Sequence, residues 1–451
     1  MDSLASLEIP VEKTDSKIRV RTDHHLWGTY ILLVIIAIIE LFSASIQEVT
    51  DGNIFMPIMR HGAFLLGGLI CMIVLQKIHY RYIYGLIPIY VVFSIGIMVV
   101  VLLWGVEVNG ARRAVTIGGT MLLPAEFMKL AAALGMAWIL SRNQEKGRRD
   151  VTVRGLVYSL IFMFVCAGVL FTQGLSNTIV VVAICFSMML IGGMSWKKFG
   201  IALLVTLALG GVAIIYKTHG KSDRPLTPRQ EMTYLLNKEN PKDIEGNGRG
   251  TTWRQRVERH FRSNKENEAF SLDNQQEQLS YIAQAHGGLQ GCGIGRSREN
   301  ARLPLAFSDY IYAIIIEEMG LFVGLGILIC YLWILGRSAK LTMCFKQTLP
   351  GVLVMGSAFT IVFQALFHMA IVSGVFPVSG QPLPLISKGG ISVLATSLAF
   401  GVMLSCSRHA ARNTDTGADQ RLELELLPEK AQSENPAMME TKAKNEKDET
   451  D

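Results

Sequence analysis

The sequence contains about ten apolar runs, each long enough to cross a lipid bilayer as a helix. A bilayer core of about 30 Å requires roughly 20 mostly apolar residues per helix. Lipid offers the backbone no hydrogen-bond partners, so such runs are expected to be α-helical. The ten runs are approximately 25–47, 61–77, 84–105, 123–141, 153–172, 176–195, 199–216, 307–336, 350–375 and 387–408. The sequence therefore predicts an all-α membrane protein with about ten transmembrane helices.

The charge content supports this class. Charged residues make up only 18% of the chain, against about 25% in a typical soluble domain. The formal net charge of +6 arises from clusters between the apolar runs and in the termini. That distribution is typical of membrane topology and not of a nucleic-acid footprint, so no nucleic-acid partner is predicted.

Lysine and arginine gather in every other connection between the runs, and such connections face the cytoplasm. The pattern predicts a multi-pass protein of the cytoplasmic (inner) membrane with both termini in the cytoplasm, which requires an even number of helices. The basic residues are Lys13, Lys17, Arg19, Arg21, Lys77, Arg81, Arg142, Lys146, Arg148, Arg149, Arg154, Lys197, Lys198, Arg337, Lys340, Lys346, Arg408 and Arg412.

Five segments follow from the runs and their polarity. We expect a cytoplasmic N-terminal segment (1–24), helices one to seven (25–216), a large extracytoplasmic loop between helices seven and eight (217–306), helices eight to ten (307–408) and a disordered cytoplasmic tail (409–451). The tail is charged and poor in apolar residues, as disordered segments are. The later part of the loop, QLSYIAQAHGGLQGCGIG, is less polar and is compatible with a re-entrant segment packed on the membrane helices.

The seven cysteines show no CxxC pair and no Cys/His spacing typical of a metal site. Five of them lie in apolar runs, where a free cysteine behaves as a small hydrophobic residue. We therefore predict neither disulfides nor a metal site.

An acidic residue, Asp309, stands at the outer start of the eighth run, in LPLAFSDYIYAIIIEEMG. A carboxylate at the edge of a membrane helix is costly, so Asp309 is a candidate functional residue. A helix N-cap explains it equally well, because aspartate is favoured there. Glu317 and Glu318 lie about two turns further along, and we interpret them as buried partners of basic residues.

A second group of charges lies in NGARRAVTIGGTMLLPAEFMKL. Arg112 and Arg113 fall in a connection predicted to be outside, against the trend of the other basic residues, so they are candidates for binding an anion. Glu126 and Lys129 are spaced i,i+3 and share one helix face. They most simply neutralise each other or a neighbouring helix.

The stretch GVFPVSGQPLPLISKGGIS leads into the last run. Its prolines and glycines predict a fixed, non-helical backbone. Gly389 and Gly390, next to Lys388, could present amide groups to an anion at the start of a helix. A plain re-entrant turn is an equally good explanation. GGLQGCGIG lacks a preceding strand, so we reject it as a dinucleotide-binding fingerprint.

Taken together, these stretches resemble the SEDS family, which comprises FtsW, RodA and SpoVE. The resemblance extends from the first helix to about Arg408. NGARR followed by PAEFMKL is similar to NGxxRW…QPSExxK, and QLSYIAQAHGGLQGCGIGRS to QSLIAIGSGGLxGKGxGxS. LPLAFSDYIYAIIIEEMG is similar to LPEAHTDFIFAVIxEELG, and FQALFHMAIVSGVFPVSGQPLPLISKGG to FQxxxNIxVxxGLLPVTGxPLPFxSYGG.

The resemblance implies a peptidoglycan glycosyltransferase that polymerises lipid II, an undecaprenyl-diphosphate-linked substrate, outside the cytoplasmic membrane. It implies a class B penicillin-binding protein as partner. Asp309 matches the family's essential aspartate and would be the general base. Glu126 and Lys129 match a buried pair, and Arg112 or Arg113 a basic loop residue.

Cations would stabilise the diphosphate leaving group. The available cations are Arg112, Arg113, Lys388 and Arg302, or a divalent cation such as Mg²⁺ or Mn²⁺.

Departures from the family pattern favour a divergent branch. They are Leu305, Phe307, Ser308, Ala114, Leu123, Ala125, Lys388 and His368. Two other functions stay open, a lipid II flippase or transporter and a non-catalytic scaffold for a class B penicillin-binding protein. The tail and the PVSGQPLPLISKGG region favour an FtsW-like division role, with other divisome proteins as partners, over elongation or sporulation.

Overall fold

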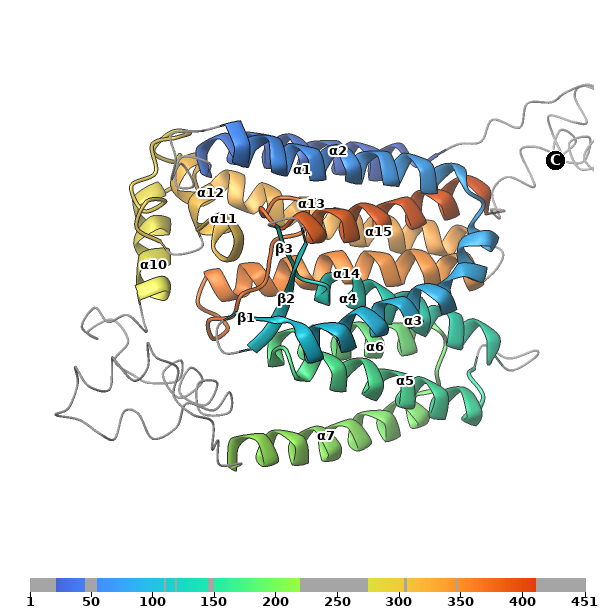
Figure 1. The fold of residues 1–451 in the computed structure, drawn as a ribbon. Helices are drawn as coiled ribbons and strands as arrows, with labels where there is room; N and C mark the ends of the chain where they lie inside the picture. The colour runs from blue at the N-terminus through green and yellow to red at the C-terminus, as the bar shows by residue number, and fades with distance from the viewer. Residues whose placement is uncertain are drawn as a thin grey trace, which may run out of the picture.

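The computed structural model describes residues 22–44, 55–108, 111–117, 120–144, 150–219, 275–303, 306–345 and 348–410. Its long helices run side by side as a bundle (Figure 1). The helices are α1 (His24–Ala44), α2 (Phe55–Lys77), α3 (Tyr80–Trp104), α4 (Ala125–Arg142), α5 (Val153–Phe171), α6 (Leu175–Ile191), α7 (Trp196–His219), α10 (Gln275–Gly287), α11 (Ala306–Asp309), α12 (Ile311–Met319), α13 (Leu321–Cys344), α14 (Thr348–Val372) and α15 (Gly390–His409).

The predicted all-α membrane class is confirmed. Among the described residues, seven helices are long and apolar enough to cross a membrane, and α6 is a shorter apolar helix. Each of the ten predicted runs contains helix. That all ten cross the bilayer stays a prediction. The first 21 residues, most of the predicted large loop and the predicted tail after residue 410 lie outside the described residues.

The eighth run is not the single helix that the sequence predicted. It consists of the short α11, then α12, then α13, with breaks at Tyr310 and Gly320. Gly320 has a φ of 86°, a left-handed conformation that glycine adopts without strain. Apolar periodicity does not reveal such a break, because the hydrophobic residues continue across it.

The connection between α3 and α4, predicted only as an outer loop, folds into a small antiparallel sheet in the order β1-β2-β3. The strands are β1 (Val106–Val108), β2 (Ala111–Ile117) and β3 (Thr120–Leu122). Ala114 pairs with Val106, and Val115 pairs with Leu122. The sheet lies at the end of the bundle where α4 and α15 begin (Figure 1).

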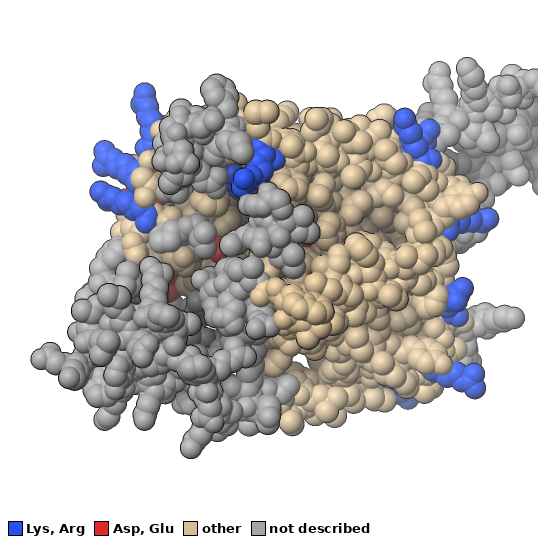
Figure 2. Space-filling model, viewed as in Figure 1, with Lys and Arg blue, Asp and Glu red and all other residues tan. Residues whose placement is uncertain are grey.

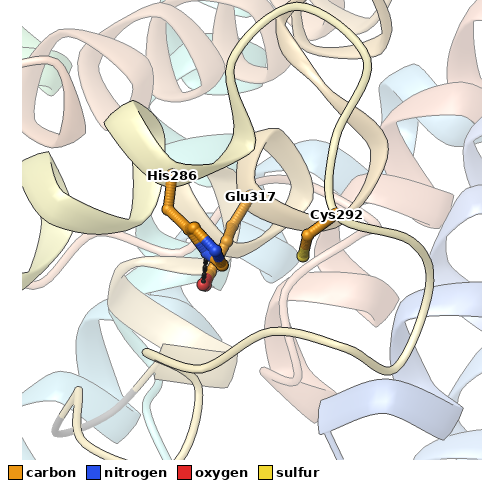
Figure 3. Close-up of side chains that lie close together, drawn as sticks. All are labelled: His286, Cys292 and Glu317. Carbon is orange, nitrogen blue, oxygen red and sulfur yellow. Dashed lines mark hydrogen bonds and ion pairs between the residues drawn. The ribbon is translucent and has the colours of Figure 1, made fainter.

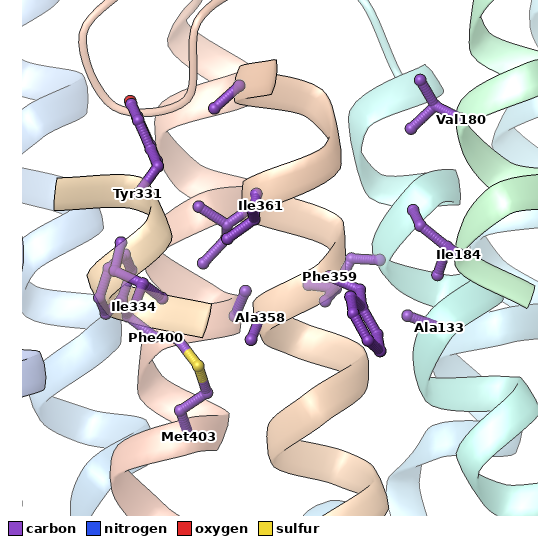
Figure 4. Close-up of a cluster of buried hydrophobic side chains, with 14 of the residues drawn as sticks. Ala133, Val180, Ile184, Tyr331, Ile334, Ala358, Phe359, Ile361, Phe400 and Met403 are labelled. Atoms are coloured by element: carbon purple, nitrogen blue, oxygen red, sulfur yellow. The ribbon is translucent and has the colours of Figure 1, made fainter. Parts of the chain in front are cut away.

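The core is centred on α14 and α15, whose most apolar 18-residue windows are each 83% buried. Small residues let the helices approach closely. A Cβ atom on Gly68 of α2 would lie 3.2 Å from the Cβ of Ser397 in α15, and one on Gly401 would lie 2.7 Å from the Cβ of Leu75. Figure 4 shows the packing of α14 against α6, α13 and α15, including Phe359, Ile361, Ile184, Val180, Tyr331, Ile334, Phe400 and Met403.

The first and last helices meet at one end of the bundle. The Asp23 amide donates to Ser407 Oγ at 3.0 Å, and Arg337 Nε donates to Asp23 Oδ2 at 2.8 Å. The rings of His79 and His409 lie 5.0 Å apart. The described chain therefore starts and ends on the same side, as an even number of crossings requires. Figure 2 shows lysine and arginine at the two ends of the bundle and a broad uncharged flank between them.

Candidate active site

Asp309 lies at the opposite end of the bundle from these terminal contacts, as the last residue of α11, and its side chain is partly buried. Tyr310 breaks the helix, and it is Tyr310 that occupies the N-cap position of α12, without a side-chain cap hydrogen bond. The N-cap explanation for Asp309 is therefore wrong. Ser308 Oγ donates to Asp309 Oδ1 at 3.0 Å.

The connection between α14 and α15, here called the 373–389 loop, packs directly on α11. Ser387 Oγ donates to the Ser308 carbonyl at 2.8 Å, and the Lys388 amide donates to the Phe307 carbonyl at 3.0 Å. A Cβ atom on Gly380 would lie 2.6 Å from Asp309 Oδ2. The carboxylate of Asp309 therefore lies against Gly380 of this loop, and a side chain at that position would displace it.

Side chains of α13 and α14 hold the backbone of the 373–389 loop. Tyr331 Oη donates to the Pro384 carbonyl at 2.5 Å, and Gln364 Nε2 donates to the Pro382 carbonyl at 3.1 Å. Leu385 is fully buried with a φ of 66°, the one positive φ of a non-glycine residue in the described ranges. Such a conformation costs about 1–3 kcal/mol and persists only where the surroundings enforce it.

Glu126 and Lys129 form an ion pair of 2.7 Å inside the bundle, with Lys129 fully buried. Lys129 Nζ also donates to Gln381 Oε1 at 3.2 Å, and Gln381 Nε2 donates to Asn177 Oδ1 at 2.7 Å. The pair is thus joined to the residue that follows Gly380. Gln381, Asn177 and Tyr331 were missed in the sequence because their polar groups acquire partners only across helices.

Lys388 is partly exposed at the start of α15, with its ammonium 5.4 Å from the centroid of the Phe307 ring. Gly389 is the N-cap of α15 and its amide donates to the Ser387 carbonyl at 2.7 Å. That Gly389 and Gly390 present amides to an anion stays a prediction. Gly390 packs closely: a Cβ there would lie 2.5 Å from the Phe64 ring.

Arg112 and Arg113 lie in β2, and the backbone register places Arg112 opposite Glu107 of β1. Their side chains lie outside the described part of the structure, so their role in binding an anion stays a prediction. Arg302 is exposed, and its Nη1 atom lies 3.5 Å from Glu299 Oε1.

Glu317 and Glu318 are buried in α12. Glu317 has a basic partner, since His286 Nδ1 lies 2.9 Å from its Oε1, whereas the described residues show no lysine or arginine ion pair with either glutamate. Backbone amides also donate hydrogen bonds to both carboxylates. Glu317 Oε1 accepts from the Arg298 amide at 2.9 Å, and Glu318 Oε2 accepts from the Gly295 amide at 3.0 Å.

The Gly295 amide belongs to the glycine turn (residues 288–295), which follows α10 and packs over the break at Gly320, and the Arg298 amide lies three residues beyond the turn. The Cys292 and Gly293 amides donate to the carbonyls of Glu317 and Glu318, both at 2.9 Å. Burial raises the pKa of the Cys292 thiol, and the two glutamates add to the shift. The turn is therefore packed on protein, which supplies the cover that a re-entrant segment needs.

Comparisons with known proteins identify similar chains along most of this length. The family model FTSW_RODA_SPOVE, described as "Cell cycle protein", matches residues 23–412. A "Probable peptidoglycan glycosyltransferase FtsW" of Tolumonas auensis is 29% identical over 395 residues, 85% of this chain and 91% of the relative. The "Stage V sporulation protein E" of Bacillus subtilis and the "Peptidoglycan glycosyltransferase MrdB" of Escherichia coli are each 27% identical over 389 residues, covering 84% of this chain and 95% and 92% of the relatives.

Solved structures share the fold. One, described as "Structural coordination of polymerization and crosslinking by a peptidoglycan synthase complex", matches with a TM-score of 0.62 and 23% identity, covering 86% of this chain and 98% of that chain. The rod shape determining protein RodA of Thermus thermophilus matches with a TM-score of 0.57 and 20% identity, covering 86% and 97%. At these identities the likeness shows the arrangement of the helices alone.

Proposed function

Because the chain belongs to the FtsW/RodA/SpoVE family of cell cycle proteins, we propose that it is a peptidoglycan glycosyltransferase that polymerises lipid II at the outer face of the cytoplasmic membrane. Relatives that carry the name peptidoglycan glycosyltransferase support the reaction class. The observation that carries the proposal is the Asp309 carboxylate, which lies at the loop-bearing end of the bundle against Gly380.

In the proposed reaction the 4-hydroxyl oxygen of one sugar attacks the anomeric carbon of another. The bond between that carbon and the lipid diphosphate breaks, and the diphosphate leaves with the electron pair. Asp309 accepts the hydroxyl proton as general base, a role worth typically about 10²–10⁴-fold in rate. Ser308 Oγ donates to its Oδ1, and its Oδ2 lies close against Gly380, so the carboxylate is oriented before substrate binds.

The leaving diphosphate requires positive charge. Among the described residues, Lys388 is the best-placed candidate. Its backbone amide donates to the carbonyl of Phe307 in α11, two residues before Asp309. Arg112 and Arg113 in β2 are further candidates from the sheet at the same end of the bundle. Fixed cations beside a developing diphosphate stabilise the transition state without reorganisation.

We place this end of the bundle outside the cell and both termini in the cytoplasm. Lysine and arginine gather in every other connection of the sequence, and such connections face the cytoplasm. A class B penicillin-binding protein is the proposed partner, and the structural likeness to a chain of a peptidoglycan synthase complex supports it. A division role stays the favoured prediction. The relatives include FtsW, MrdB and a sporulation protein at similar identity, so they do not discriminate.

The test is polymerisation of purified lipid II by the protein with its partner, followed as glycan ladders on a gel. Asp309→Asn should lower the rate by about 10²–10⁴-fold while folding and partner binding persist. Asp150→Asn, at the opposite end of the bundle, is the matched control and should keep its rate. Full polymerisation by Asp309→Asn would remove the general base from the mechanism.

The same variant separates the alternatives. A flippase would move lipid II across vesicles without polymerising it, and a scaffold would complement a depleted strain with Asp309→Asn as well as with the wild type. Arg112→Ala and Arg113→Ala should raise the lipid II concentration needed for half-maximal rate. An unchanged rate curve for both would argue against their contact with the diphosphate.

A further inference from the structure

Three potential metal ligands come together where α10 and the glycine turn meet α12. They are His286 at the end of α10, Cys292 in the turn and Glu317 in α12 (Figure 3). Their ligand atoms all lie within 4.8 Å of one another. We propose that His286, Cys292 and Glu317 bind a divalent transition metal ion, with Zn²⁺ as the best match, outside the proposed catalytic site.

The donor set selects the metal. A thiolate, an imidazole and a carboxylate suit Zn²⁺, whereas Mg²⁺ and Ca²⁺ require oxygen ligands. Metal–ligand bonds of about 2.0–2.3 Å in a tetrahedral site place the ligand atoms roughly 3.3–3.8 Å apart. The observed limit of 4.8 Å therefore needs a closure of about 1.5 Å at most, which rotations of the partly exposed His286 and Cys292 side chains can provide.

Glu317 is already oriented as a metal ligand should be. Its Oε1 accepts from the Arg298 amide and from His286, and its Oε2 accepts from Ser297 Oγ. A carboxylate oxygen offers two lone pairs, so Oε2 keeps one for a metal ion. Partners behind a ligand fix its direction and are worth about 10–100-fold in metal affinity.

The charges around the cluster point to a cation. Glu40, Glu317 and Glu318 are almost fully buried, and within the described ranges no lysine or arginine side chain forms a salt bridge with them. Both carboxylate oxygens of Glu40 lack a hydrogen-bond partner, and Glu318 lies within its electrostatic reach. Buried carboxylates without a countercharge are costly, so a bound metal ion would relieve this region.

The consequence of such a site is mechanical. The metal would link the end of α10 and the glycine turn to α12, whose first turn follows directly on Asp309. Glu317 lies six residues, or about 9 Å, along α12 from Ile311. The ion would therefore lie too far from Asp309 to take part in the reaction. It would instead fix the position of α12, the helix that carries Glu317.

The experiment uses the full chain in detergent micelles, reduced and purified without an oligohistidine tag. Co²⁺ added to the protein should give a thiolate-to-cobalt charge-transfer band in the near ultraviolet, saturating at one equivalent and lost on addition of Zn²⁺. Cys292→Ser should abolish the band, and Cys344→Ser, which alters a partly buried cysteine at the other end of α13, should keep it.

His286→Gln provides a second ligand variant and should weaken Zn²⁺ binding by about 100-fold or more. Both variants alter side chains that are not fully buried, so the fold is expected to survive. Absence of the band in the wild-type protein, or an equal band in Cys292→Ser, would overturn the proposal. Neither result depends on polymerase activity, so the proposed function and the metal site fail separately.

Discussion

Replacement of Lys129 by methionine tests whether the buried ion pair stabilises the bundle and the 373–389 loop. Lys129 is fully buried and its ammonium donates to Glu126 at 2.7 Å and to Gln381 at 3.2 Å. Methionine fills a similar volume but leaves the Glu126 carboxylate, which is 7% exposed, without its countercharge.

The expected cost is dominated by the stranded carboxylate. Breaking a buried pair by removing one partner costs about 3–5 kcal/mol. The lost hydrogen bond to Gln381 adds only about 0.6 kcal/mol, the average for such bonds between membrane helices. A total of about 4.6 kcal/mol corresponds to roughly a 2 × 10³-fold change in the folding equilibrium. Replacing both charges, in Glu126→Met with Lys129→Met, removes the stranded charge and should cost much less.

The assay is unfolding by sodium dodecyl sulfate in mixed micelles, followed by the fluorescence of the six tryptophans. Arg142→Met alters an exposed cation of the same helix, stacked on Trp138 at 4.4 Å, and should cost no more than about 1 kcal/mol. If Lys129→Met is as stable as Arg142→Met, or if the double variant is less stable than Lys129→Met, the reasoning about the stranded carboxylate is wrong.

Two further predictions concern opposite ends of the bundle. Gly380→Ala would place a Cβ 2.6 Å from Asp309 Oδ2, and displacing that carboxylate by about 1 Å should lower lipid II polymerisation by roughly 100-fold; Gly326→Ala, with open space around its Cβ, is the control, and equal rates for the two would contradict the placement. The hydrogen bond from Lys198 to Asp150 lowers the pKa of Asp150, so its stabilisation is present above the unfolded pKa of about 3.9 and is lost as pH falls below it. The melting temperature of Asp150→Asn should therefore lie below the wild type at pH 7 and converge with it near pH 3, and a constant gap would refute the assignment.

The sequence correctly predicted the features that depend on a single helix. Each of the ten apolar runs contains helix, because transmembrane length and hydropathy are local properties. The break at Gly320 was not predictable in this way, since it is stabilised by the glycine turn that packs over it. The sheet of β1, β2 and β3 was missed for a related reason, because β1 and β3, the partners of β2, have only 3 residues each and are too short to show an alternating pattern.

For the candidate site, the sequence predicted residue types better than partners. Asp309 and Lys129 were singled out because charge is rare in apolar segments. The partner of Lys129 in the 373–389 loop, Gln381, is 252 positions away, and no spacing rule reaches that far. The cluster of His286, Cys292 and Glu317 was missed because metal-site motifs are recognised by close spacing, whereas this one is assembled by the return of α12 under the glycine turn.

The contact between the first and last helices has a consequence for biosynthesis. α15 packs along α2 through Gly68 and Gly401 and holds Asp23 through Ser407, yet among the described helices it is the last to leave the ribosome. The earliest inserted helices must therefore wait in the membrane without their permanent neighbour until translation is nearly complete. A chain that ends before residue 390 would lack α15 and could not form these contacts, so the bundle closes only after α15 has been synthesised.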